Sequence, residues 1–144
     1  MITTLEKVLF LKEVSLFRNI SSERLAKIAT IAKEVEFLKG DKIINEGDEG
    51  DSLFIIVEGN VSILKGKDII AKLGPRDFFG EMAILDSEPR SASVIADSEI
   101  VCLKISREDF TEILIDEHEI MLAIIRSLVH RLRQSNLKTE KKNQ

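Results

Sequence analysis

The stretch between Val35 and Ile105 limits the possible folds more than any other part of the sequence. Short runs rich in β-branched residues recur there about every eight residues, and glycine, aspartate and lysine turns separate them. The turns "EGN" and "LKGKD" are typical of tight reversals between antiparallel strands. The spacing therefore predicts an antiparallel sandwich or barrel whose strands include the runs DKIIN, SLFIIVEG, NVSILK, DIIAKL, SASVIA and EIVCLKI.

Helical spacing of apolar residues replaces this pattern at both ends of the chain. Ser21 or Ser22 is a candidate N-cap for the second N-terminal helix, and Ser106 with Asp109 resembles a capping box. We see no linker or repeat that divides the chain. The sequence predicts one domain, mainly β with flanking helices (α+β): N-terminal helices at 4–33, an antiparallel β-roll or jelly-roll barrel at 34–105, C-terminal helices at 106–138 and a frayed tail at 139–144.

The composition is that of an ordinary soluble domain, with 44% hydrophobic and 32% charged residues among 144. The net charge of −4 argues against a nucleic-acid partner, and about a dozen residues after Leu132 are too few for a DNA-recognition module. The apolar runs are too short to cross a bilayer, and the N-terminus is unlike a signal peptide. The single Cys102 excludes an intramolecular disulfide. We expect a cytoplasmic protein, or the cytoplasmic domain of a larger membrane protein.

The stretch "DFFGEMAILDSEPRSASV", residues 77–94, is suited to an anionic sugar-phosphate ligand. Glu81 and Arg90 stand nine positions apart, and small residues border both. A phosphate favours a guanidinium and backbone N–H groups, whereas a sugar hydroxyl can donate to a carboxylate. Small side chains let a ligand approach the backbone, and Pro89 stiffens the chain before Arg90. Without this context, a surface ion pair between Glu81 and Arg90 is the favoured interpretation.

Residues 79–92 resemble the phosphate-binding cassette of the cyclic nucleotide-binding domain family. The upstream segment "GDEGDSLFIIVEGNVSI" resembles the glycine-marked strand and turn of the same family. The resemblance covers nearly the whole chain, and the cassette is especially similar to those of bacterial cyclic-nucleotide-gated potassium channels and of cAMP-dependent kinase regulatory subunits. It implies a site for cAMP, with cGMP as the less favoured ligand, and no metal.

The resemblance also implies roles for individual residues. Glu81 would accept a hydrogen bond from the ribose 2′-hydroxyl, and Gly80 would permit the close approach of the ribose. Arg90 would pair with the cyclic phosphate. Two further features would assist Arg90: the Ser91 hydroxyl, and backbone N–H groups near Ala83 and Ala92.

The base would lie between the barrel and the last helix. In the family this helix folds over the base as a lid, and the candidates here are Leu128, Arg131 and Leu132. The flat Arg131 guanidinium is suited to stack on a purine, although a solvated helix position is an equal alternative. Ile63 and Met82 would line the base side.

Other residues have structural interpretations. Gly47, Gly50 and Gly59 are expected in turns with positive φ, and Phe78 and Phe79 in core or hinge packing. His118 and His130 form no recognisable ligand set, so neither a metal nor an enzyme is expected.

The sequence favours a regulatory sensor that binds cAMP, or cGMP, and signals through movement of its C-terminal helix. Its partner would be an effector domain or protein such as a channel, transporter or kinase. The alternative is an interaction module without nucleotide response, which forms a homodimer through its terminal helices.

Overall fold

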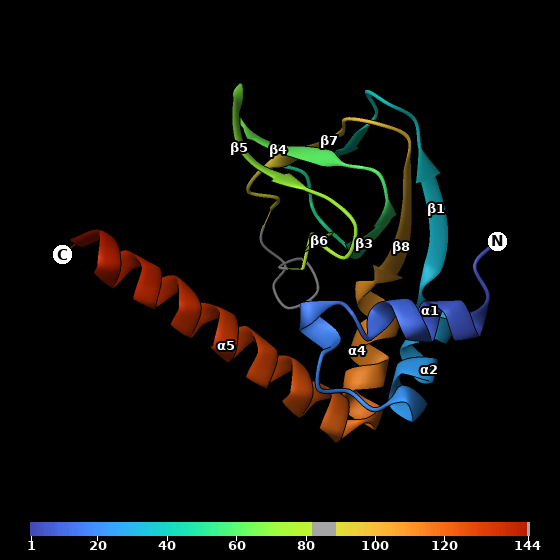
Figure 1. The fold of residues 1–144 in the computed structure, drawn as a ribbon. Helices are drawn as coiled ribbons and strands as arrows, with labels where there is room; N and C mark the ends of the chain where they lie inside the picture. Colours follow the sequence, from blue (N-terminus) through green and yellow to red (C-terminus); the bar gives the residue numbers. More distant parts are fainter. Residues whose placement is uncertain (82–88, 144) are drawn as a thin grey trace.

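The computed structural model describes residues 1–81 and 89–143, with side chains up to residue 137. A β-roll forms the upper part of Figure 1, and the helices pack below it. The elements in chain order are α1 (Thr4–Leu11), η1 (Ser15–Phe17), α2 (Ser22–Ile31), β1 (Lys33–Phe37), β2 (Lys42–Ile44), β3 (Ser52–Glu58), β4 (Val61–Lys65), β5 (Asp68–Leu73), β6 (Phe78–Phe79), β7 (Ser93–Ala96), β8 (Ile100–Ser106), α4 (Arg107–Asp116) and α5 (His118–Asn143).

Two antiparallel four-stranded sheets form the β-roll, with strand orders β1-β8-β3-β6 and β2-β7-β4-β5. The central strand β3 is buried on both faces. Leu53 and Ile55 belong to the core beneath the first sheet, whereas Phe54 and Ile56 belong to the core between the two sheets. Burial on both faces explains why this strand is continuously apolar instead of alternating with polar residues.

Three helices, α1, α2 and α4, begin at side chains that accept hydrogen bonds from their free N–H groups. Thr3 and Glu6 form a capping box at α1, and the Ser21 hydroxyl accepts from the Arg24 N–H at α2. Ser106 likewise accepts from the Asp109 N–H at 3.2 Å. Thus Ser21 is the cap of α2, and α4 begins where the sequence indicates.

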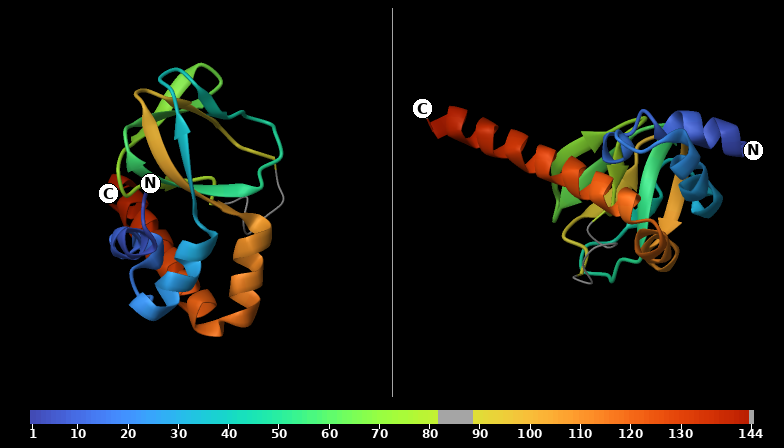
Figure 2. Two further views of the ribbon diagram at one scale, coloured as in Figure 1. Left: turned by 90° about the vertical axis from the view of Figure 1, so that its right-hand side faces the viewer. Right: turned by 90° about the horizontal axis from the view of Figure 1, so that it is seen from below.

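α5 packs only its first half against the rest of the domain. Ile120, Ala123, Ile124 and Ser127 are buried, whereas every described residue from 129 to 137 is exposed. Figure 2 shows the distal half projecting away from the β-roll. The backbone remains helical to Asn143, whereas the sequence pattern predicted that the C-terminal helices end at residue 138.

The observed architecture confirms the predicted fold class, antiparallel β with helices at both ends. Each of the predicted runs overlaps a strand, but β1 and the two-residue β6 lie outside those runs. Gly47 and Gly59 have φ values of 89° and 94°, as expected, whereas the expectation of positive φ at Gly50 is wrong. At Gly59 a Cβ atom would lie 2.3 Å from the Glu99 carbonyl oxygen, so the turn needs glycine. Among the described residues, no helix is long and apolar enough to cross a bilayer.

Candidate functional site

Two backbone carbonyl groups hold the Arg90 guanidinium. Nη1 donates to the Gly80 carbonyl oxygen at 3.1 Å, and Nη2 donates to the Ser52 carbonyl oxygen at 2.9 Å. Ser52 begins β3 and Gly80 follows β6, and these two strands pair with each other. A guanidinium has five N–H donors, so these bonds leave others free to meet an anion.

The backbone of Arg90 is fixed by the turn that precedes β3. Its N–H donates to the Asp48 carbonyl oxygen at 2.7 Å, and its own carbonyl accepts from the Gly47 N–H at 2.8 Å. The neighbouring Pro89 and Glu49 form an antiparallel bridge. The glycine-marked turn therefore positions the arginine, although the two segments are far apart in the sequence.

Burial and nearby charges have opposing effects on Arg90. Desolvation lowers the pKa of its guanidinium from the ordinary value and is the largest effect. The Asp51 and Glu81 carboxylates raise that pKa, and the Arg107 guanidinium lowers it. Arginine nevertheless stays protonated in proteins. The site thus holds a partly desolvated cation, which an anionic ligand would stabilise.

Gly80 makes room for the Arg90 side chain. Its φ is 81°, and a Cβ atom there would lie 2.7 Å from Arg90 Nη1 and 2.7 Å from the Ser52 carbonyl oxygen. The family resemblance implies that this glycine admits the ribose. The structure gives it an additional role, since a larger residue would displace the guanidinium.

Glu81 pairs with the long helix and not with Arg90. Its Oε1 lies 3.9 Å from Arg131 Nη1, and the carboxylate side chain is 28% exposed. The Arg131 Cζ also lies 4.9 Å from the centre of the Phe78 ring. The surface pair between Glu81 and Arg90 is therefore absent, and Arg131 bridges the strand β6 and the glutamate that follows it. Phe79 points into the core and stacks on Phe54, as its packing interpretation predicts.

The other candidate residues lie beside Arg90, on β4, or outside the described residues. Ser91 and Ala92 follow Arg90 directly and lead into β7, and Ser91 is exposed. Ile63 on β4 packs against the core between the sheets, opposite Val94 of β7. Met82 and Ala83 lie outside the described residues.

Within the described part of the site, contacts are seen for one of the three lid candidates. Leu128 packs against the lower core, and Leu132 is 61% exposed. Arg131 contacts two described residues of the site region, Glu81 and Phe78. The three candidates lie within about one turn of the helix. The sequence alone therefore could not show which of them faces the site, because that depends on how the helix is oriented.

The sequence did not single out Ser52, Asp51 or Arg107 as site residues. The Ser52 hydroxyl donates to Asp51 at 2.9 Å, and Asp51 acts on the charge of Arg90. Arg107, the first residue of α4, donates from its side chain to the Gly50 carbonyl. No motif marks these residues, since their placement depends on β3 and β8 running side by side.

His130 and Cys102 lie outside the hydrogen bonds that hold Arg90. His130 lies within 3.3 Å of Gln134 on the exposed side of α5. Within the described part of the chain, no three potential metal ligands gather. Cys102 is buried in β8, and burial raises the pKa of its thiol to about 12.

Comparison with known proteins identifies related sequences and folds. Residues 34–117 match the family model of the cyclic nucleotide-binding domain. Two forms of the Drosophila melanogaster cGMP-dependent protein kinase, isozyme 2, are 36% identical over 119 residues, or 77% of this chain. The chain spans only 13% and 11% of the length of these kinases.

Solved structures with the same fold include regulators of transcription. The N-terminal domain of a transcriptional regulator from Streptomyces coelicolor has a TM-score of 0.80 and 30% identity, and covers 88% of this chain and 94% of its own. The Thermus thermophilus catabolite activator protein has a TM-score of 0.75 and 27% identity, and the match covers 90% of this chain and 63% of that protein.

Proposed function

Because the chain belongs to the cyclic nucleotide-binding domain family, we propose that it is a regulatory sensor whose Arg90 binds the cyclic phosphate. One observation carries this assignment: the Arg90 guanidinium is held in a partly buried position by the Gly80 and Ser52 carbonyls. A cation whose orientation is fixed before binding loses little entropy when an anion arrives. The role is regulatory and involves no chemical step.

The remaining contacts would come from both sides of Arg90. In the proposed complex the Ser91 hydroxyl and the Ala92 N–H support the phosphate, together with the N–H groups near Ala83. Glu81 accepts from the ribose 2′-hydroxyl. Ile63 and Met82 line the base side of the site.

We propose cAMP as the ligand, because its base requires no specific donor from the protein. The names of the Drosophila kinases make cGMP the alternative. Ser91 is exposed, and its hydroxyl is available to either a phosphate or a guanine amino group.

The long helix would transmit the binding event. Arg131 already contacts the site through Glu81. A ribose hydroxyl that donates a hydrogen bond to the Glu81 carboxylate would therefore remove one partner of Arg131. In the proposed response Arg131 then stacks on the purine, and α5 moves with it. A ligand can bias this equilibrium only by its different affinity for the two helix positions. The effector would be a separate domain or protein, such as a channel, transporter or kinase.

Isothermal titration with cAMP, cGMP and 5′-AMP tests the assignment. We expect heat of binding with a cyclic nucleotide and much weaker binding of 5′-AMP, which lacks the cyclic phosphate. Absence of heat with either cyclic nucleotide at millimolar concentration would contradict the proposal.

The exposed apolar residues of α5 favour one other candidate function, a self-association module. Leu122, Ile125, Val129 and Leu132 are 42–61% exposed and follow the three-and-four spacing of a coiled-coil seam. Size-exclusion chromatography with and without cAMP separates the two functions. A dimer whose stability is indifferent to cAMP would favour the module.

A further inference from the structure

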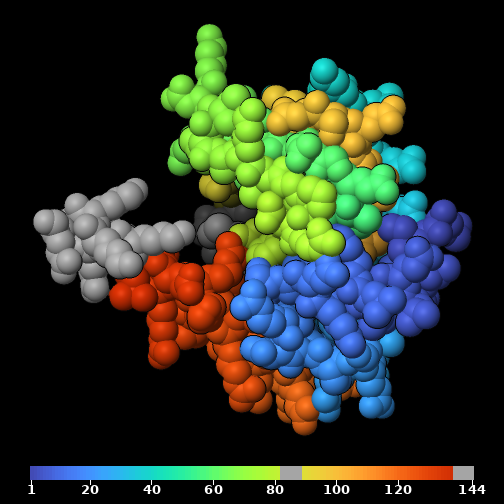
Figure 3. All heavy atoms as spheres, in the orientation of Figure 1, coloured from blue at the N-terminus to red at the C-terminus, as the bar shows by residue number. Residues whose placement is uncertain are grey.

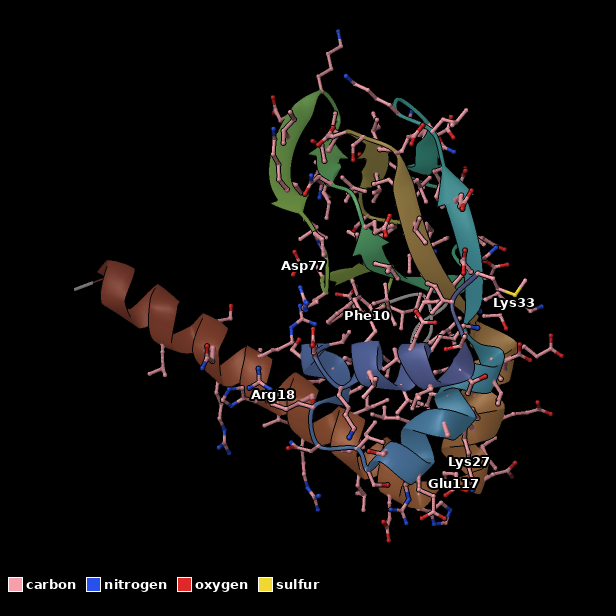
Figure 4. The ribbon with its side chains drawn as sticks, turned by 45° about the vertical axis from the view of Figure 1, so that its right-hand side comes forward. Phe10, Arg18, Lys27, Lys33, Asp77 and Glu117 are labelled. Atoms are coloured by element: carbon pink, nitrogen blue, oxygen red, sulfur yellow. The ribbon has the colours of Figure 1, made fainter. Side chains whose placement is uncertain are left out.

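A basic groove runs between η1 and α5. The groove is open to solvent, with a volume of about 970 Å³. Its charged lining consists of Arg18 from the N-terminal side and Arg126, Arg131 and Arg133 from the long helix. His130 lies on the same wall, and none of the described lining residues is acidic. The two walls adjoin in the space-filling view of Figure 3, and Figure 4 shows Arg18 beside α5.

The positive charge of this groove contrasts with the rest of the chain. Over 118–143, the sequence of α5, there are six Lys or Arg and two Asp or Glu residues, a net charge of +4. The whole chain carries −4, so the remaining residues carry −8. Long-range electrostatics would therefore draw an anionic group toward α5 in preference to the surface of the remaining chain.

Apolar side chains lie beside the arginines. Ile125 and Val129 line the groove and are 49% and 42% exposed. Arg126 and Arg133 are two helical turns apart, about 10 Å, and flank this apolar stripe. A complementary partner would therefore present apolar residues along one face and carboxylates beside them.

We propose that this groove binds an acidic amphipathic helix of a partner protein. The apolar face of that helix covers Ile125 and Val129, and its carboxylates pair with Arg126 and Arg133. The Arg18 guanidinium provides a third positive group from the opposite wall. Such a helix matches both the charge and the spacing of the groove.

A second copy of this chain fits the groove less well. In the heptad frame that begins at Leu122, Arg126 and Arg133 occupy the flanking e positions, while the g positions hold Leu128 and Ser135. A parallel pair of α5 helices would oppose each arginine with an uncharged residue, and an antiparallel pair would bring arginines together. An acidic partner supplies the missing charge in either orientation.

Membranes and nucleic acids also fit less well. A flat anionic bilayer or a duplex would face the net −8 of the remaining chain as well as the groove. A single peptide segment contacts the groove alone, and it buries apolar residues that a phosphate backbone would leave exposed.

The groove and the proposed nucleotide site share Arg131. Where the proposed function holds, a carboxylate in the groove competes with Glu81 for Arg131 and leaves Glu81 free for the ribose. Peptide and nucleotide would then strengthen each other's binding, because coupling between two sites is reciprocal.

The test uses the full chain without nucleotide, so its result is independent of the proposed function. The probe is a fluorescein-labelled helical peptide of leucine, alanine and glutamate, with glutamates at i, i+4 and i+7; a lysine version is the control. Anisotropy at low and moderate salt measures binding. The double variant Arg126→Glu/Arg133→Glu should weaken binding by at least about ten-fold.

Lys39→Glu/Lys67→Glu is the matched control, because it changes the net charge equally at two exposed residues of the β-roll. We expect less than about a two-fold change in this variant. Binding of the acidic peptide that is lost only in the arginine variant supports the proposal. The proposal would be overturned if both double variants lost the same affinity for the acidic peptide, or if the lysine peptide bound as well as the acidic one. Absence of acidic-peptide binding at low salt would also overturn it. Tighter binding to phosphatidylserine vesicles, to duplex DNA or to a second copy, with the same arginine dependence, would also overturn the assignment of a peptide partner.

Discussion

Arg90 and Arg131 lie on the two regions that meet at the candidate site, and they are held in different ways. Four backbone hydrogen bonds fix Arg90 within the β-roll, two to its side chain and two to its main chain. Arg131 lies on the exposed half of α5, with its side chain 47% exposed, and among the described residues it contacts the Glu81 carboxylate and the Phe78 ring.

This difference is consistent with the two proposed roles, phosphate binding by Arg90 and switching by Arg131. A fixed guanidinium loses little conformational entropy on binding, whereas a solvated one can exchange partners at small cost. We therefore expect changes at Arg90 to cause the largest loss of nucleotide affinity, and changes at Arg131 to alter the position of α5.

Arg90→Ala should have the largest effect. It removes the proposed cationic partner of the cyclic phosphate, so we expect nucleotide binding to weaken by about 2–5 kcal/mol. Isothermal titration measures the loss, and Arg133→Ala, an exposed residue of α5, is the control. Wild-type affinity in the Arg90 variant would show that the phosphate binds elsewhere.

Gly80→Ala should be the next largest change. Both Gly80 and Gly40 have positive φ, at 81° and 91°, but only at Gly80 would a Cβ atom meet neighbours. Alanine should therefore strain the backbone by roughly 1–3 kcal/mol at either position. Only the Gly80 variant should also displace Arg90 and lose about ten-fold in nucleotide affinity.

Chemical denaturation and titration of the two glycine variants separate these effects. Equal nucleotide affinity in the Gly80→Ala and Gly40→Ala variants would mean that Gly80 does not hold Arg90 in its binding position.

Arg131→Gln should have a smaller energetic effect, because an exposed ion pair contributes about 0–1 kcal/mol and a cation–π contact about 0.5–1 kcal/mol. We expect a broader distance distribution between spin labels placed at Lys67 and Asn136 in the ligand-free protein. Cys102 should stay unlabelled, since its raised thiol pKa of about 12 leaves almost no thiolate at neutral pH. Arg133→Gln is the control, and identical distributions in both variants would refute the role of the Arg131 contact.

Glu117→Gln should have the smallest effect, at the anchored base of α5. The hydrogen bond from Lys27, with the charges of Lys27 and Arg24, lowers the pKa of the Glu117 carboxyl from its ordinary 4.5. Figure 4 shows Lys27 and Glu117 together where α2 meets the junction of α4 and α5.

A carboxyl group whose pKa is lower in the folded state stabilises the protein at pH values above its ordinary pKa. This stabilisation is lost as the pH falls through the pKa of the folded state. The wild type should therefore exceed Glu117→Gln in stability at neutral pH, and the difference should shrink below about pH 4.5. Urea unfolding at several pH values measures this difference. Glu112→Gln, an exposed residue of α4, is the control. A difference that is independent of pH would contradict the assignment.

The sequence predicted the fold well because the strands carry strong local signals. Alternating turns and apolar runs identify the β-roll, and Ser106 marks the start of α4. The short β6 escapes such patterns, because Phe78 and Phe79 form a strand only by pairing with β3.

The site was predictable only in part. Glu81 and Arg90 stand out through their spacing, and the family resemblance added Arg131. The contacts that orient them come from Ser52, Asp48 and Gly47, and these depend on long-range pairing of backbone groups. A main-chain carbonyl acts in the same way whatever side chain its residue carries, so the sequence gives little sign of these roles.

The contact between Glu81 and Arg131 also has a consequence for timing. In the proposed complex the ribose needs a carboxylate that the helix already occupies, so each productive encounter must await the opening of that contact. The observed association rate would then rise with nucleotide concentration and reach a plateau set by the opening rate. Stopped-flow measurements would thus report how often α5 releases the β-roll on its own.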